Sequence, residues 1–101
     1  MNNFRTYNLA VEFYRLSSAL EIDGHLKMQL SRASSSIALN LAEGYGKHSN
    51  KDRARFYQIA FGSIRECQAI LMLSNLQSSS EWEKLDCVAA HLYRLLQKAG
   101  G

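Results

Sequence analysis

Residues 40–49, NLAEGYGKHS, contain two glycines that interrupt an otherwise helical pattern. On both sides of them apolar residues recur every three or four positions, which is the spacing of one face of an α-helix. We interpret Gly44 as the left-handed residue that ends one helix, and Gly46 as the residue that lets the chain reverse. Ser49, with Asp52 three positions later, matches the capping box that begins a helix. The stretch therefore predicts a turn between two helices in the middle of the chain.

A phosphate-binding loop is the alternative interpretation of the same glycines. Such a loop follows a strand and ends in Gly-Lys-Ser or Gly-Lys-Thr, with four residues between its glycines. Here His48 separates Lys47 from Ser49, the preceding element is helical, and the spacing between the glycines is missing. The sequence therefore disfavours nucleotide binding at this turn.

The rest of the chain repeats the helical pattern. Asp23-Gly24 separates the first helix from the second, and the serines at 78–80 end the third. Ser80 and Glu83 match a second capping box. The pattern continues through the serine-rich residues 33–36, so we expect the second helix to continue there despite the weak helix propensity of serine. The predicted helices cover residues 4–21, 25–43, 50–77 and 81–99. Their short connections predict one all-α domain over residues 1–101, an antiparallel up-down-up-down four-helix bundle.

Composition narrows the class of protein. Of the 101 residues 47% are hydrophobic and none is proline, and no apolar run is long enough for a membrane span. The N-terminal residues do not resemble a signal peptide. Cys67 and Cys87 are isolated in the sequence, which predicts two buried thiols in a reducing cytoplasm rather than a disulfide or a zinc site. A net charge of +3 permits binding to a polyanion without requiring it.

The first helix carries two apolar stripes on opposite sides. One stripe consists of Phe4, Tyr7, Val11, Tyr14 and Ser18, and the other of Leu9, Phe13, Leu16 and Leu20. One side can face the core of the chain and the other then needs a partner, so we expect an oligomer with Leu9, Phe13, Leu16 and Leu20 at the interface. The alternative is that this helix is simply the most central one.

The most basic part of the sequence surrounds the central turn. Its candidate nucleic-acid-binding residues are Lys47, Lys51, Arg53 and Arg55, and only Asp52 opposes them. A helix N-terminus with free N–H groups beside several cations attracts anions. A solvated helix start is the alternative interpretation.

A polar line follows the second helix at helical spacing: Gln29, Arg32, Ser36, Asn40 and Glu43. We expect Glu43 to form a buried ion pair with an arginine of the third helix. No paired acids, nucleophile–base pair or metal-ligand set accompanies this line. The sequence therefore predicts a protein that is not an enzyme and that has no cofactor and no metal site.

Residues 29–74 resemble a known family, the bacterial four-helix-bundle proteins named after the intervening sequences of 23S rRNA genes. The resemblance rests on a combination of short motifs spread over the second and third helices. The matching residues are Arg32-Ala33, Ser36-Ile37, Asn40, Ala42-Glu43-Gly44, Gly46-Lys47, Ser49, Phe56-Tyr57 and residues 60–66, AFGSIRE, which include Gly62 and Glu66.

This resemblance implies a homopentameric ring of four-helix bundles. A related branch, the accessory variability protein of diversity-generating retroelements, is a basic pentamer that binds nucleic acid and a reverse transcriptase. We therefore expect a non-enzymatic pentameric protein that binds RNA or DNA through the basic turn. The alternative is a protein–protein adaptor, a ring that serves as a scaffold for a partner enzyme such as a reverse transcriptase.

Overall fold

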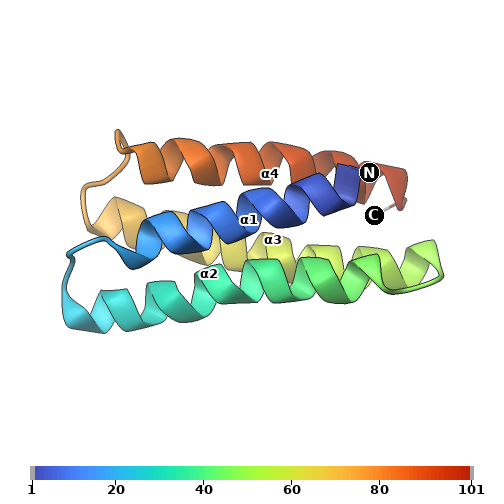
Figure 1. The fold of residues 1–101 in the computed structure, drawn as a ribbon, viewed down its shortest axis with the longest axis horizontal. Helices are drawn as coiled ribbons and strands as arrows, with labels where there is room; N and C mark the ends of the chain where they lie inside the picture. The colour runs from blue at the N-terminus through green and yellow to red at the C-terminus, as the bar shows by residue number, and fades with distance from the viewer. Residues whose placement is uncertain (1, 101) are drawn as a thin grey trace.

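The computed structural model describes residues 2–100 and contains four α-helices, with no strand in that range. They are α1 (Asn2–Ser18), α2 (Gly24–Tyr45), α3 (Asn50–Leu73) and α4 (Ser80–Lys98). Figure 1 shows the four helices side by side and alternating in direction. Each helix packs against the helices before and after it, and α1 also packs against α4, which closes the bundle. The predicted all-α four-helix bundle is confirmed.

The serine-rich middle of α2 is helical, as predicted. Serine side chains often compete with the backbone for hydrogen bonds, but here they bond to carbonyls within the helix. Ser34 Oγ donates to the Ser31 carbonyl at 3.3 Å, and Ser35 Oγ donates to the Arg32 carbonyl at 3.0 Å. The helix therefore passes through residues 33–36 without a break.

The connection between α3 and α4 begins earlier than the sequence predicted. The third helix ends at Leu73, and Asn75 adopts a left-handed conformation with φ of 58°. The Leu76 N–H then donates to the Leu71 carbonyl at 2.8 Å, a hydrogen bond typical of a helix C-terminus. The predicted cap of the fourth helix is also wrong by one residue, because Ser79 rather than Ser80 accepts the N–H of Trp82 at 3.1 Å.

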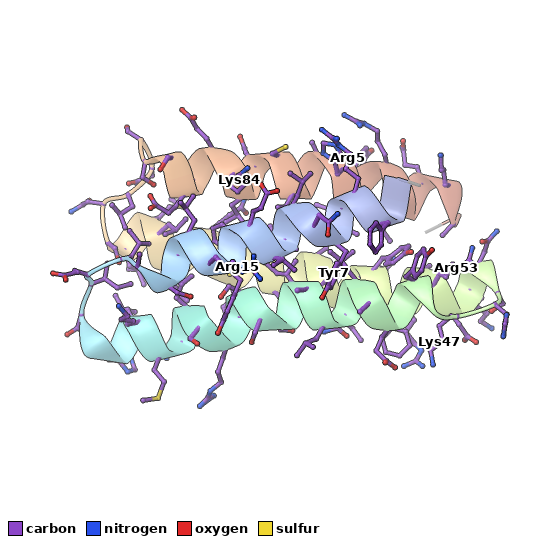
Figure 2. The ribbon with its side chains drawn as sticks, viewed as in Figure 1. Arg5, Tyr7, Arg15, Lys47, Arg53 and Lys84 are labelled. Carbon is purple, nitrogen blue, oxygen red and sulfur yellow. The ribbon has the colours of Figure 1, made fainter. Side chains whose placement is uncertain are left out.

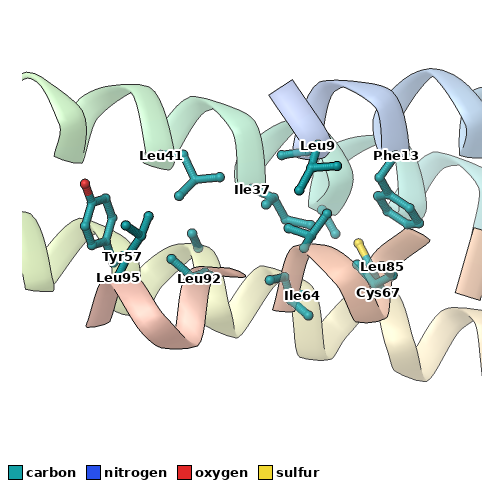
Figure 3. Close-up of a cluster of buried hydrophobic side chains, with 14 of the residues drawn as sticks. Leu9, Phe13, Ile37, Leu41, Tyr57, Ile64, Cys67, Leu85, Leu92 and Leu95 are labelled. Carbon is teal, nitrogen blue, oxygen red and sulfur yellow. The ribbon is translucent and has the colours of Figure 1, made fainter. Parts of the chain in front are cut away.

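The core lies along the bundle axis and receives side chains from all four helices (Figure 3). Among its fully buried members are Phe13, Ile37, Ile64, Leu85 and Leu92. The buried residues of each helix recur at helical spacing, so one face of every helix is removed from water. Burial of a side chain of this size stabilises the fold by about 1.5–3 kcal/mol.

The predicted interface on α1 is wrong for two of its residues. Leu9 is 9% exposed and Phe13 is 0% exposed within the single chain, so both belong to its own core. Leu20 is half-buried and packs against the same core, and Leu16 is also half-buried. Both stripes are present on α1, but the stripe that was predicted to contact another subunit lies against the core of the same chain. In the other stripe Phe4 is exposed, whereas Tyr7, Val11 and Tyr14 are half-buried and Tyr7 packs against the same core.

The antiparallel arrangement brings distant segments to one end of the bundle. Figure 1 shows the start of α1 and the end of α4 at the same end as the turn between α2 and α3. The opposite end carries the α1–α2 and α3–α4 connections. No helix in the described part of the chain is long and apolar enough to cross a membrane.

Candidate nucleic-acid interface

The turn between α2 and α3 is held by backbone and side-chain hydrogen bonds. The Gly46 N–H donates to the carbonyls of Ala42 and Glu43, both at 3.2 Å. Ser49 Oγ accepts the Asp52 N–H at 3.1 Å, so the predicted cap of the third helix is confirmed. Removal of such a cap costs about 1 kcal/mol.

The sequence analysis predicted that Gly44 ends α2 in a left-handed conformation. This prediction is wrong. The helix continues to Tyr45, and Gly46 follows it with φ of −79°. Gly44 is instead buried where α2 approaches α3, and a β-carbon built on it would lie 2.5 Å from Tyr57 Cε1. The absence of a side chain at this position lets the two helices come together beside the turn.

Three of the four predicted binding residues gather around the turn. Lys47 Nζ lies 5.1 Å and Arg55 Cζ 4.6 Å from the centre of the Phe56 ring, distances at which a cation is attracted to an aromatic face. Arg53 Nε donates to the Lys47 carbonyl at 2.8 Å, which fastens the turn to the first turns of α3. Figure 2 shows Lys47 and Arg53 together at this end of the bundle. Arg53 therefore supports the turn, while Lys47 and Arg55 lie at the surface around it.

Lys51 is exposed on the first turn of α3, one helical turn before Arg55. Residues four apart lie on one face of a helix, so these two cations face the same way. A helix N-terminus adds its own partial positive charge to theirs.

The prediction for Glu43 is wrong. Its side chain is 61% exposed and lies 3.8 Å from Lys47, four residues along the chain. It forms neither a buried ion pair nor a pair with an arginine of α3. A solvent-exposed pair of this kind contributes little to stability.

Sequence reasoning missed a second basic group at the same end. The start of α1 supplies Arg5 and the end of α4 supplies Arg94 and Lys98, and Figure 2 shows Arg5 on α1 where it runs beside α4. Residues 2–8, 40–57 and 91–98 together contain seven lysines and arginines and only two carboxylates. The seven cations are Arg5, Lys47, Lys51, Arg53, Arg55, Arg94 and Lys98. We call this region the basic end.

The charge is reversed at the opposite end of the bundle. Residues 16–27 and 70–86 contain five carboxylates and two lysines. The two ends therefore carry charges of opposite sign, which largely cancel in the net charge of +3. The sequence could have revealed this difference in charge, because the predicted topology shows which helix termini lie at each end of the bundle.

The polar line of α2 meets α3 through a chain of hydrogen bonds. Asn40 Nδ2 lies 3.1 Å from Ser36 Oγ, which lies 2.8 Å from Ser63 Oγ. Ser63 Oγ in turn donates to the Ile59 carbonyl at 3.3 Å. A groove of about 290 Å³ beside this chain is lined by Gln29, Arg32, Ala33, Ser36, Ser63 and Glu66. The residues behind the family resemblance thus divide between this α2–α3 seam and the turn. Gly62 is exposed on α3, with nothing within 4 Å of a β-carbon built on it.

The two cysteines lie in different environments. Cys67 is fully buried in the core, and this burial, with a smaller effect of Glu66, raises the pKa of its thiol from 9.0 to about 12. Cys87 is only half-buried, contrary to the prediction of two buried thiols, and its sulfur lies 3.8 Å from His91 Nδ1. Within residues 2–100 no three His, Cys, Asp or Glu side chains form a group that could hold a metal.

Comparison with known proteins identifies the family but no individual relative. No curated protein and no solved structure matches the chain. The family model described as "23S rRNA-intervening sequence protein" matches residues 4–98, which includes all but the ends of the bundle. The resemblance seen in residues 29–74 therefore extends over α1 and α4 as well. The chain belongs to the 23S rRNA-intervening sequence protein family.

Proposed function

We propose that this protein is a non-enzymatic, ring-forming protein that binds the phosphate backbone of RNA or DNA at its basic end. The observation that carries the proposal is the gathering of seven cations from three separate segments at one end of the bundle. Lysine and arginine contacts to phosphates supply most of the affinity in sequence-independent nucleic-acid binding. Lys47, Lys51 and Arg55 are the primary contacts, and Arg53 holds the turn that presents them.

Assembly strengthens the same argument. In a cyclic ring whose axis runs along the helices, every subunit presents its basic end on the same side. The fields of the subunits then add, so a modest charge on each chain becomes a strong positive face. The family resemblance supports a ring of five subunits, and we include this number of subunits in the proposal.

The side of α1 that carries Phe4 and Val11 is the surface that we assign to subunit contacts. Phe4 is 53% exposed and stacks on Tyr7, with ring centroids 6.4 Å apart. Phe4 also lies 6.3 Å from the Tyr45 ring of α2, and Tyr45 is 47% exposed. Exposed aromatic groups of this kind are enriched at protein interfaces. Light scattering of the Val11→Glu variant tests the assignment, with Leu39→Glu on the outer face of α2 as the matched control.

We expect Val11→Glu to lower the mass of the assembly and Leu39→Glu to leave it unchanged. A wild-type protein that is a stable monomer at micromolar concentration would overturn the ring. A ring that survives Val11→Glu but dissociates with Leu39→Glu would move the interface to α2.

Nucleic-acid binding is tested by the salt dependence of the affinity. The triple variant Lys47→Gln, Lys51→Gln and Arg55→Gln leaves Arg53, and thus the turn, intact. The control variant Arg15→Gln, Arg32→Gln and Arg65→Gln removes three cations that lie outside the basic end. Filter binding of a fluorescent RNA and a DNA duplex is measured over a range of salt concentrations.

The first variant should reduce the slope of log K against log salt by about 3, since each neutralised phosphate contributes about 0.9 for B-DNA. The control should change the slope much less. Absence of binding to RNA and DNA at low salt would refute the function, and equal effects of the two variants would refute the assigned surface.

An adaptor function is the second candidate, and the exposed apolar side chains favour it. Met28 and Leu39 on α2 are each 65% exposed, and Leu73 at the end of α3 is 71% exposed. Apolar groups in water at this level are typical of protein-binding surfaces when they form a patch. Copurification from a nuclease-treated lysate separates the candidates. A partner enzyme, such as a reverse transcriptase, that remains bound after nuclease treatment supports the adaptor, and loss of all bound material supports nucleic-acid binding.

A further inference from the structure

A cleft of about 230 Å³ lies between α1 and α4 at the basic end, apart from the α2–α3 turn. The described residues that line it are Arg5, Thr6, His91, Arg94, Leu95 and Lys98. Three of these six are permanent cations, one is an imidazole, and none is a carboxylate. The cleft therefore concentrates positive charge without a neutralising acid among its described lining.

The helix periodicity explains why these side chains meet. His91, Arg94, Leu95 and Lys98 are spaced as the members of one face of α4. Leu95 is 7% exposed and Thr6 of α1 is fully buried, so these two form the floor of the cleft. Arg5, Arg94 and Lys98 are exposed and form its rim. A buried floor keeps water away from one side of the cations, which strengthens their attraction for an anion.

His91 is oriented by its own helix. Its Nδ1 lies 2.9 Å from the Cys87 carbonyl, and because a carbonyl can only accept, Nδ1 carries the hydrogen. The other ring nitrogen, Nε2, remains for other partners, and His91 is one of the residues that line the cleft.

The nearest acid on the same face of α1 is already paired. Glu12 lies two helical turns beyond Arg5, and Lys84 of α4 donates to its carboxylate at 2.7 Å. This ion pair joins α1 to α4 next to the cleft. Lys84 chiefly, and Arg5 to a smaller extent, lower the pKa of the Glu12 carboxyl. Glu12 is not part of the cleft lining, so inside the cleft the oxygen atoms of a bound anion would be the partners of the rim cations.

We propose that the α1–α4 cleft is a binding site for a phosphate group. Arginine presents a planar fork of N–H donors that matches phosphate oxygens, and the cleft offers two such forks and one ammonium. The volume is below the roughly 300–1,000 Å³ of pockets that enclose drug-sized ligands, so the cleft suits a phosphate group rather than a whole nucleoside. The phosphate can belong to a nucleic-acid strand or to a free phosphate compound. The site rests on the proposed function in that Arg5, Arg94 and Lys98 belong to the basic end, but it does not need the contacts at the α2–α3 turn.

The test uses inorganic phosphate and pyrophosphate with the intact protein at low ionic strength. Two-dimensional NMR of 15N-labelled protein should show shifts at Arg5, Thr6, His91 and Arg94 that saturate with phosphate concentration. The double variant Arg5→Gln and Arg94→Gln should weaken this binding at least tenfold. The matched control, Arg15→Gln and Arg65→Gln, removes two exposed arginines that lie outside the basic end and should leave phosphate binding within twofold.

The source of the phosphate is distinguished by a second titration with a 5′-phosphorylated oligonucleotide and the same oligonucleotide without the phosphate. Tighter binding of the phosphorylated form that is lost in the Arg5/Arg94 variant places a strand terminus in the cleft. Equal binding of both, together with saturable phosphate binding, indicates a free phosphate compound as the ligand.

Absence of saturable shifts at the cleft with millimolar phosphate or pyrophosphate overturns the site. Equal weakening by the control variant overturns it too, because the effect would then come from general charge. Neither result bears on the salt-dependent binding of long RNA or DNA through Lys47, Lys51 and Arg55, so the two proposals fail separately.

Discussion

Gly44 of α2 lies against the ring of Tyr57 in α3, so closely that a β-carbon on Gly44 would come within 2.5 Å of Tyr57 Cε1 and 2.9 Å of Cδ1. Tyr57 is 2% exposed, so its ring is enclosed by the side chains of the core. The two helices can therefore approach each other at the turn only if residue 44 has no side chain.

Gly44→Ala is expected to destabilise the fold by about 1–3 kcal/mol, because the new methyl group must displace a packed ring. The better helix propensity of alanine offsets less than about 1 kcal/mol of this cost. Chemical denaturation measures the free energy of unfolding.

Gly62→Ala is the matched control for this change. Gly62 is also a helical glycine, but it is exposed and nothing lies within 4 Å of its β-carbon position. We expect a gain in stability of up to about 1 kcal/mol. Equal effects at the two glycines would contradict the close packing of Gly44.

Ser79→Ala is expected to cost about 1 kcal/mol, because it removes the acceptor of the Trp82 N–H at the start of α4. Ser80→Ala should change the stability by less than about 0.5 kcal/mol, since Ser80 Oγ is exposed and makes only a 3.5 Å contact with Glu81. Thermal unfolding of the two variants compares them directly. The opposite order would restore Ser80 as the cap.

Arg53→Met is expected to destabilise the turn by about 1 kcal/mol, because the hydrogen bond from Nε to the Lys47 carbonyl is lost. Lys51→Met is the control, because it removes an exposed cation of the same region and should leave the stability within about 0.5 kcal/mol. Amide hydrogen exchange of residues 44–52 measures the local effect. Unchanged exchange in Arg53→Met would show that Arg53 does not hold the turn.

The buried thiol of Cys67 predicts a loss of stability at high pH. Its pKa is about 12 in the folded chain and 9.0 in the absence of burial. Above pH 9 the unfolded chain loses this proton while the folded chain keeps it, so the free energy of unfolding falls by up to about 1.4 kcal/mol per pH unit until about pH 12. Below pH 9 both states hold the proton and the effect disappears.

Cys67→Ala should lack this part of the pH dependence, while other titrating groups still contribute. The measurement is therefore the difference in unfolding free energy between wild type and Cys67→Ala at pH 8 and pH 10.5. A difference that does not shrink as the pH rises would contradict the raised pKa. Alkylation provides a second readout, because half-buried Cys87 should react well before Cys67.

The number of helices, their order and the cap at Ser49 could be predicted from the amino-acid sequence. These features depend on local chemistry, namely apolar residues at helical spacing and a hydroxyl that accepts a backbone N–H. The family resemblance was also readable, because its motifs lie within two consecutive helices. The predicted end of α3 was too late in the chain. The helix ends before the left-handed Asn75, a conformation that the sequence pattern around this residue does not indicate.

The stripe of α1 that faces the core is selected by the packing of the four helices. Both stripes are apolar enough to be buried, and the contacts of α1 with its neighbouring helices decide that Leu9 and Phe13 are buried most deeply. The same holds for Gly44, whose role depends on a tyrosine thirteen positions away in the chain. Packing between helices joins residues that no local pattern connects. For that reason the basic end, built from Arg5, Lys47 and Arg94, exists only once the bundle has closed.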